Sequence, residues 1–170
     1  MKVMVARLRG NSVQLELEDA PEPAVGPTDL LIAVRAVALN RVDLLGTPYR
    51  FGHSPADAGP AAGIEMAGEI VEMGEEVVGF RLNERVAAMA VASMAQLVKV
   101  DYRLAMRLPH ELPWEAAAAL PVGHLTAHDA LTSNGAMQPG ASILVRGAGS
   151  GVGVAAMQIA RLKGAGLVIG

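Results

Sequence analysis

One stretch of the chain decides the fold: Ile143-Leu144-Val145-Arg146-Gly147-Ala148-Gly149-Ser150-Gly151-Val152-Gly153-Val154-Ala155-Ala156-Met157-Gln158-Ile159-Ala160-Arg161. It predicts a buried strand, a glycine turn and the start of a helix. The free N–H groups of a first helical turn carry partial positive charge and need an acceptor, which a pyrophosphate supplies. Glycines let a ligand approach the backbone, and one of them can take a positive φ at the turn.

A second interpretation of this turn stays open, in which the glycines serve only close packing between strand and helix. The glycines at 147, 149, 151 and 153 do not follow the literal G-x-G-x-x-G spacing. A Walker phosphate loop is excluded, because no Gly-Lys-Ser/Thr sequence follows.

Composition restricts the remaining possibilities. The 170 residues are 52% hydrophobic but only 3% aromatic, so the core must consist of Ala, Val, Leu, Ile and Met. The net charge is −3 without a basic cluster, so we expect neither nucleic acid nor a membrane as a partner. The longest apolar stretch, residues 86–98, is too short to span a bilayer. The absence of cysteine excludes disulfides and thiolate metal sites and fits a cytoplasmic protein.

The first two thirds of the chain have the pattern of short antiparallel strands. We expect a hairpin turning at Gly10-Asn11, a helical turn over Asn40–Gly46 and a long loop over Thr47–Pro60. The expected strands are Met1–Arg9, Val13–Glu18, Asp29–Leu39, Gly63–Val71, Arg85–Met89 and Ala95–Val100.

The pattern then changes to alternating helix and strand. Pro113-Trp114-Glu115 opens a helix, which Pro121 and Gly123 are expected to interrupt and His124–Leu131 to resume. Gly166–Ile169 is the next strand. We therefore expect a β-barrel-like domain over residues 1–115, followed over residues 116–170 by the first βαβ unit of a Rossmann fold. A complete Rossmann sheet needs more strands, so this one should expose an edge and an apolar face.

Four segments, taken in order, resemble the medium-chain dehydrogenase/reductase superfamily, in its zinc-free quinone oxidoreductase (zeta-crystallin-like) branch. The resemblance covers nearly the whole chain, and the order of the segments makes it specific. They are Asn40-Arg41-Val42-Asp43, Gly63–Val71 with Gly74 and Gly79-Phe80, Ala116–Pro121 with Thr126-Ala127, and the glycine turn.

The resemblance implies a GroES-like catalytic domain, a Rossmann domain and a nicotinamide held in the cleft between them. Members of the family normally complete the Rossmann sheet, so the chain looks truncated. The segment Arg81–Val86 departs from the family's Gly-Asp-Arg-Val, although asparagine at position 83 tolerates a positive φ.

The resemblance also bears on zinc. By this resemblance, zinc alcohol dehydrogenases of the same superfamily carry Cys-His-x-Asp at the positions of residues 40–43. They carry Gly-His-Glu at the positions of residues 63–65. Asn40 and Ile64 are not zinc ligands here, and catalytic zinc needs three protein ligands. His124 and His128 form the one helical i,i+4 histidine pair, which we interpret as solvent-facing or capping side chains. No metal site is predicted.

The catalytic candidates follow from the resemblance, with a structural alternative for each. Asn40 would lie near nicotinamide and substrate and donate to a carbonyl oxygen; alternatively it caps a turn. Tyr49, in the long loop, is a second hydrogen-bond donor or a surface residue. Asp43 is expected to hold the loop by bonding backbone amides, and the role of Glu65 stays open.

The predicted cofactor-binding residues include Asn40, Thr126 and the glycine turn. Thr126 would lie beside the cofactor, or bond back to the preceding helical turn. In the turn, Ser150, Gly151 and Val152 would offer backbone amides to the pyrophosphate, and Gly149 and Gly153 would give clearance. Arg146 is interpreted as a solvated residue at the strand end.

The expected function is hydride transfer from NADPH or NADH to a small-molecule quinone or α,β-unsaturated carbonyl, without zinc. The side chain that selects between the cofactors lies roughly 20 residues past the glycines, and the resemblance favours NADPH. An enoyl or alkenal reductase of the same superfamily is a second hypothesis. A non-catalytic, truncated protein is a third, and a homodimer is a further expectation.

Overall fold

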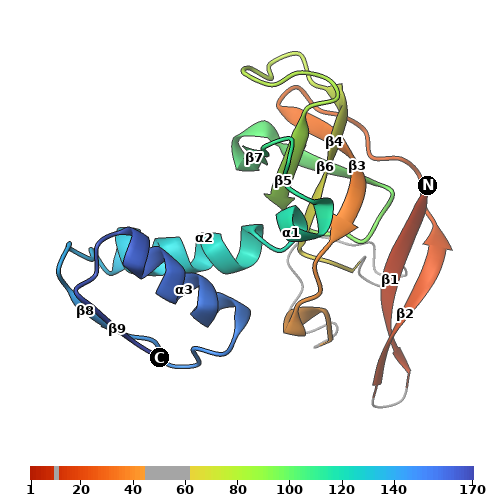
Figure 1. Ribbon diagram of the computed structural model, residues 1–170. Helices are drawn as coiled ribbons and strands as arrows, with labels where there is room; N and C mark the ends of the chain where they lie inside the picture. Colours follow the sequence, from red (N-terminus) through yellow and green to blue (C-terminus); the bar gives the residue numbers. More distant parts are fainter. Residues whose placement is uncertain (10–11, 45–61) are drawn as a thin grey trace. The chain divides into compact units, whose positions relative to one another are not determined.

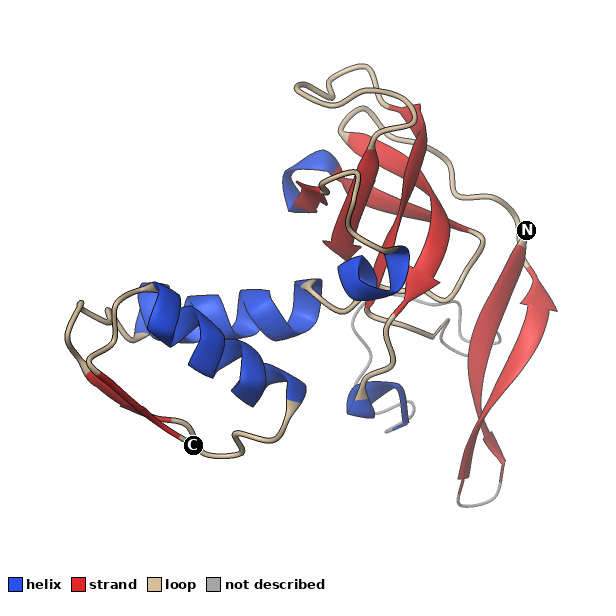
Figure 2. Cartoon of the chain, in the orientation of Figure 1, coloured by secondary structure: helices blue, strands red, loops and turns tan. Residues whose placement is uncertain are grey.

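The computed structural model describes residues 1–9, 12–44 and 62–170 (Figure 1). The chain divides into two compact units, Met1–Ala119 and Leu120–Gly170. Strands dominate the first unit and helices the second (Figure 2). Each unit is described by itself.

The first unit is built on a curled antiparallel sheet, as expected for a barrel-like domain. In the described part of the chain this sheet has five strands in the order β6-β3-β4-β5-β7. The strands are β3 (Asp29–Val37), β4 (Glu65–Met73), β5 (Arg85–Met89), β6 (Leu97–Asp101) and β7 (Ala105–Arg107).

The sheet curls because the pairing of β3 with β4 is irregular. The register shifts between Leu31 and Ile32 and again between Val34 and Ala36, and such bulges increase local twist. Gly68 faces the second irregularity, where an added Cβ would lie 2.3 Å from the Ala33 carbonyl oxygen. Glycine is therefore required for β3 to approach β4 this closely.

The core of the sheet is aliphatic, as the composition predicts. Its fully buried Leu, Ile, Met and Val side chains contribute roughly 1.5–3 kcal/mol each through burial. The cluster contains Leu30, Ile32, Met66, Ile70, Val86, Ala88, Val98 and Val100.

The two strands of the expected hairpin pair as a separate two-stranded sheet, while its predicted turn at Gly10-Asn11 lies outside the described residues. β1 (Lys2–Arg9) pairs with β2 (Ser12–Asp19), with Lys2 opposite Asp19 and Arg9 opposite Ser12. The Met4 backbone ties β1 to the chain around β4 and β6, since its amide donates to Met94 (2.8 Å) and its carbonyl accepts from Ala62 (2.8 Å). The hairpin is thus part of the first unit.

α1 (Trp114–Ala118) belongs to the first unit, because Ala117 and Ala118 pack with Ala67 and Ala87 of the sheet. This unit therefore continues past residue 115, where the sequence placed the boundary.

The expected interruption of a helix by Pro121 and Gly123 is wrong in detail. Pro121 begins α2 (Pro121–Asp129), where its missing N–H has no cost, and Gly123 lies inside that helix. The chain breaks instead at Ala119 and Leu120. α2 continues into a short π-helical turn, η4 (Ala130–Asn134).

The second unit contains the expected βαβ arrangement. β8 (Ser142–Leu144) and β9 (Leu167–Ile169) are parallel, with Ile143 opposite Val168, and α3 (Gly151–Leu162) connects them. The fold thus matches the start of a Rossmann domain. No helix in the described part of the chain has the length and apolar content needed to cross a bilayer.

Two short elements flank the strands. η1 (Arg41–Leu44) confirms the expected helical turn as far as residue 44. η3 (Tyr102–Leu104) leads into β7, a strand that the sequence did not predict. Asn83, at the turn before β5, has φ 63°, so asparagine does supply the left-handed conformation there.

Candidate functional site

Asn40 and Glu65 meet because of the antiparallel pairing of β3 with β4. Val37, at the end of β3, lies opposite Met66, at the start of β4. Residues that follow β3 are thereby brought beside the first residue of β4. Together with Asp43 these two side chains form what is called here the Asn40 site.

The Asn40 site is held by three hydrogen bonds. The Asn40 Nδ2 donates to Glu65 Oε1 at 2.8 Å. The Asn40 backbone amide donates to Asp43 Oδ2 at 2.7 Å, and the Asp43 amide donates to the Asn40 carbonyl at 3.0 Å. Asp43 therefore bonds a backbone amide, as predicted, whereas the side chain of Asn40, the residue just before η1, bonds Glu65.

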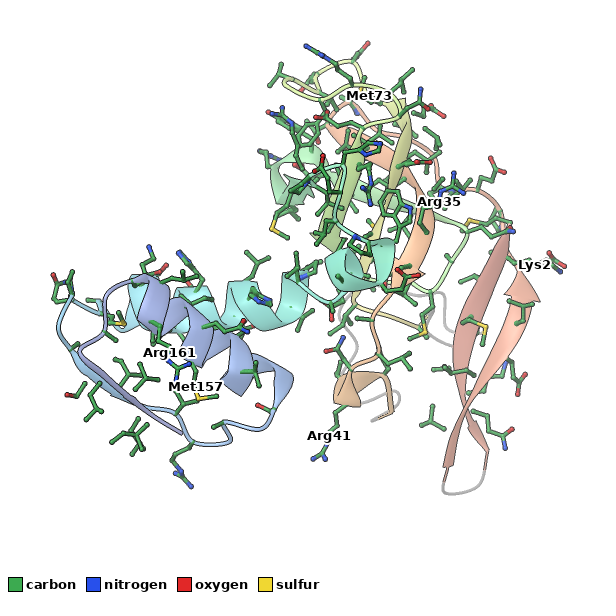
Figure 3. All side chains as sticks on the ribbon, in the orientation of Figure 1. Lys2, Arg35, Arg41, Met73, Met157 and Arg161 are labelled. Carbon is green, nitrogen blue, oxygen red and sulfur yellow. The ribbon has the colours of Figure 1, made fainter. Side chains whose placement is uncertain are left out.

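Burial differs within the site. Glu65 is only 3% exposed, whereas Asn40 is half-buried. Arg41 is exposed, and Figure 3 shows its side chain directed away from η1. Tyr49, the second predicted catalytic residue, lies outside the described residues and stays a prediction.

The described residues contain no group of three His, Cys, Asp or Glu side chains that could hold a metal ion. The two helical histidines have hydrogen-bond partners within their own helical segment. His124 Nδ1 lies 3.1 Å from the Leu120 carbonyl oxygen, and His128 Nδ1 lies 3.2 Å from Thr132 Oγ1. His128 is exposed. Both histidines thus have roles within α2 and η4.

The glycine turn joins β8 to α3 through a left-handed residue. Gly147 has φ 75°, which confirms that one glycine of the turn takes a positive φ. The Ser150 hydroxyl caps α3: it accepts from the Gly153 amide at 3.1 Å and donates to the Gly147 carbonyl at 2.8 Å. These bonds fix the direction in which the helix starts.

The first amides of α3 differ in availability. The Ser150 amide donates to the Gly147 carbonyl at 2.9 Å, so it is already engaged, contrary to the simple expectation for a pyrophosphate donor. Within the described residues the amides of Gly151 and Val152 have no backbone acceptor outside the helix. Both residues are exposed, so an anion can reach them.

The glycines of the turn serve two purposes. An added Cβ at Gly149 or Gly151 would meet nothing within 4 Å, which leaves the space a ligand needs. At Gly153 it would lie 2.3 Å from the Gly147 carbonyl oxygen. The missing side chain of Gly153 therefore makes room for the Gly147 backbone. A part for Gly153 in cofactor binding stays a prediction.

Thr126 lies on α2 and is exposed. Gly123, one turn earlier, approaches α3: its added Cβ would lie 3.7 Å from the Gly151 carbonyl oxygen. Arg146 is also exposed, in keeping with a solvated residue at the strand end.

Sequence reasoning missed two side chains. Glu65 was left without a role, although its place in the segment that resembles Gly-His-Glu marked it as a neighbour of Asn40. Arg85 organises the chain before α1: it stacks on Trp114, with its guanidinium carbon 3.8 Å from the ring centroid, and donates to the carbonyls of Pro109, His110 and Leu112. A strand-initial arginine and the one tryptophan of the sequence were the available signals.

The curled antiparallel sheet and the following βαβ unit define the N-terminal part of a medium-chain dehydrogenase/reductase. Residues 26–110 match the family model described as "Alcohol dehydrogenase GroES-like domain". The chain belongs to this family, which confirms the resemblance seen in its motifs.

Individual relatives agree with this assignment. The synaptic vesicle membrane protein VAT-1 homolog of Mus musculus is 36% identical over 152 residues, 89% of this chain. A quinone oxidoreductase from Thermus thermophilus, also solved in complex with NADPH, is 32% identical, with a TM-score of 0.76 over 99% of this chain. The CurK enoyl reductase is 27% identical, with a TM-score of 0.83 over 95% of this chain.

The chain spans only part of each of these proteins. It covers 37% of the length of the mouse relative and 52% of each of the two solved chains.

Proposed function

We propose that this protein is a zinc-independent oxidoreductase that transfers hydride from NADPH or NADH to a quinone or an α,β-unsaturated carbonyl. The observation that carries the proposal is the exposed glycine turn, where the amides of Gly151 and Val152 and the open space at Gly149 fit a pyrophosphate. A bound nicotinamide supplies the hydride. The NADPH complex of the Thermus thermophilus relative supports this cofactor.

The residues of the chain have separate tasks in this proposal. The first amides of α3 and Thr126 of α2 hold the cofactor. Asn40 donates an N–H to the carbonyl oxygen on which negative charge develops. Zinc independence is supported by the Asn40 site itself. The Asn40 carboxamide stands there at the position where, by resemblance, the zinc enzymes have a cysteine ligand.

Cofactor binding is tested with Gly151→Asp, measured by calorimetric titration with NADPH. The new carboxylate places bulk and negative charge at the start of α3, so binding should be lost. The control is Gln158→Glu, which adds the same charge to an exposed position of the same helix and should leave the affinity unchanged. Equal affinity of wild type and Gly151→Asp would refute the proposal.

The CurK enoyl reductase favours enoyl reduction as the second candidate function. The two candidates are separated by comparing kcat/KM for phenanthrenequinone with kcat/KM for an enoyl thioester. Treatment with EDTA should leave the rate with the preferred substrate unchanged if no zinc takes part.

We also propose a homodimer and a cytoplasmic location. The exposed apolar side chains of the second unit, among them Leu144 and Leu162, support self-association, and the absence of cysteine is compatible with the cytoplasm. Light scattering of the purified protein and cell fractionation test these two points.

A further inference from the structure

Glu65 is the one buried charged side chain in the described part of the chain. It begins β4, a strand whose first four residues are all buried. A buried carboxylate is costly unless hydrogen bonds stabilise it, so its retention at this position calls for an explanation. The proposed function gives it no task.

Its contact with Asn40 determines how that amide is oriented. A carboxylate only accepts hydrogen bonds, so the Nδ2 end of the carboxamide must face Glu65, as the 2.8 Å contact shows. Among the described residues nothing else bonds Asn40 Oδ1 or the second N–H of Nδ2, so both can meet a ligand. Without Glu65, the carboxamide could turn over and exchange its donor and acceptor ends.

The backbone of Asn40 is fixed as well. Its amide donates to the Asp43 carboxylate at 2.7 Å and its carbonyl accepts from the Asp43 amide at 3.0 Å. With the backbone held by Asp43 and the side chain by Glu65, the carboxamide is preorganised. A preorganised donor needs no reorganisation when charge develops on a substrate oxygen.

We propose that Glu65 is a positioning residue, which holds the Asn40 carboxamide in the single orientation that presents its second N–H to the carbonyl oxygen of the substrate. This inference rests on the proposed function. Glu65 acts by orientation and not by charge, because a carboxylate beside a developing oxyanion repels it.

The first test observes the side-chain NH₂ group of Asn40 by ¹⁵N NMR, with Asn40→Asp to assign its signals. Glu65→Gln should shift these signals, because a glutamine can pair with either end of the carboxamide. Asn134 provides a matched control: its Nδ2 donates to Asp129 Oδ2 at 2.8 Å at an exposed site. Asp129→Asn should shift the Asn134 signals and leave those of Asn40 unchanged.

The second test is a double-mutant cycle on turnover with NADPH and a quinone. Removing an oriented donor typically costs about a hundredfold in kcat, so we expect this for Asn40→Ala. Loss of a supporting contact typically costs about tenfold, which we expect for Glu65→Gln in kcat, with KM little changed. The double variant should be no slower than Asn40→Ala alone, because Glu65 acts through Asn40.

If Glu65→Gln does not fold, Glu65→Asp replaces it in both tests. The aspartate keeps the negative charge but is too short to reach Asn40 in the same way, so it should also shift the Asn40 signals and lower kcat. Unmoved Asn40 signals, or multiplicative losses in the cycle, would overturn the inference and leave the proposed function standing. Absence of NADPH-dependent turnover in the wild type, with the Asn40 signals intact, would overturn the proposed function and the positioning role with it.

Discussion

At the scale of single residues, the two glycines at the start of α3 are not equivalent. Gly153 packs against the Gly147 carbonyl, whereas Gly151 faces open space. From the sequence alone, a glycine that leaves space for a ligand cannot be told from one that lets the backbone pack closely. Only the contact of helix with turn makes this distinction.

Gly153→Ala should therefore destabilise the protein, because its Cβ would lie 2.3 Å from a backbone oxygen that cannot move without disturbing the turn. Overpacking of this kind costs about 1–3 kcal/mol. Gly151→Ala should be neutral or stabilising by about 0.4–1 kcal/mol, through the reduced entropy of the unfolded chain. Urea unfolding monitored by far-UV circular dichroism measures both; equal stabilities would show that Gly153 is not tightly packed.

Asp101 provides a pH-dependent prediction. The Arg103 guanidinium, which donates to Oδ1 at 2.8 Å and to Oδ2 at 2.5 Å, holds the pKa of the Asp101 carboxyl well below its usual range. The Arg103 amide and the Thr28 hydroxyl also donate to it. Because the folded pKa lies below the unfolded value of about 3.9, the ionised carboxylate stabilises the fold above that value, and this contribution is lost as the pH falls.

Asp101→Asn should accordingly lower the Tm near neutral pH, and the difference from wild type should shrink below about pH 4. Thermal unfolding across this pH range measures the effect. Asp19→Asn is a comparison at the exposed Lys2 pair, where hydrogen bonding to Lys2 also lowers the pKa of the carboxyl. A Tm difference for Asp101→Asn that stays constant with pH would contradict the assignment.

At the scale of elements, the sequence predicted most strands correctly because alternation and turn residues are local signals. Arg85–Met89 has the expected bounds, and β3 differs only at its end. β7 was missed because three residues after a 3-10 turn carry no periodic pattern, and β7 exists only through its pairing with β5. The Asn40–Glu65 contact was likewise invisible locally, since it depends on the register of β3 with β4.

The Arg85–Trp114 pair attaches α1 and the chain before it to the sheet. Arg85 lies at the start of β5, stacks on Trp114 and donates to three carbonyls between residues 109 and 112. Arg85→Met keeps the length of the side chain but removes every donor. Since hydrogen bonds to charged groups contribute about 1.5–3 kcal/mol, we expect a loss of at least about 2 kcal/mol in unfolding free energy.

Arg35→Met is the matched control for Arg85→Met. Arg35 pairs with Glu69 at 2.7 Å, but its side chain is 53% exposed, and such surface pairs contribute only about 0–1 kcal/mol. Chemical denaturation, with tryptophan fluorescence reporting on Trp114, compares the two variants. Similar losses would mean that the Pro109, His110 and Leu112 carbonyls find other donors, water included, when Arg85 is removed.

At the scale of the whole chain, the two units differ in how they are stabilised. Both clusters of buried apolar side chains lie in the first unit, which holds large residues such as Leu30, Ile32 and Ile70. In the second unit the fully buried apolar side chains are small, namely Pro121, Ala127, Ala155 and Ala160. Large apolar side chains remain exposed there: Leu125, Leu144, Val152, Val154, Leu162, Leu167 and Ile169.

Buried apolar area supplies most of the stability of a fold, so local unfolding should be easier in the second unit. We expect amide hydrogen exchange in the native protein to be slowest in β3, β4 and β5, at rates governed by global unfolding. The amides of β8 and β9, whose pairing covers only three residues in each strand, should exchange at least about tenfold faster, since a difference of 1.4 kcal/mol in opening free energy gives that factor. Protection in β9 equal to that in β4 would show that the second unit unfolds together with the sheet. Addition of NADPH should slow exchange at the start of α3 if the cofactor binds the glycine turn, because a ligand that binds only the closed form stabilises it.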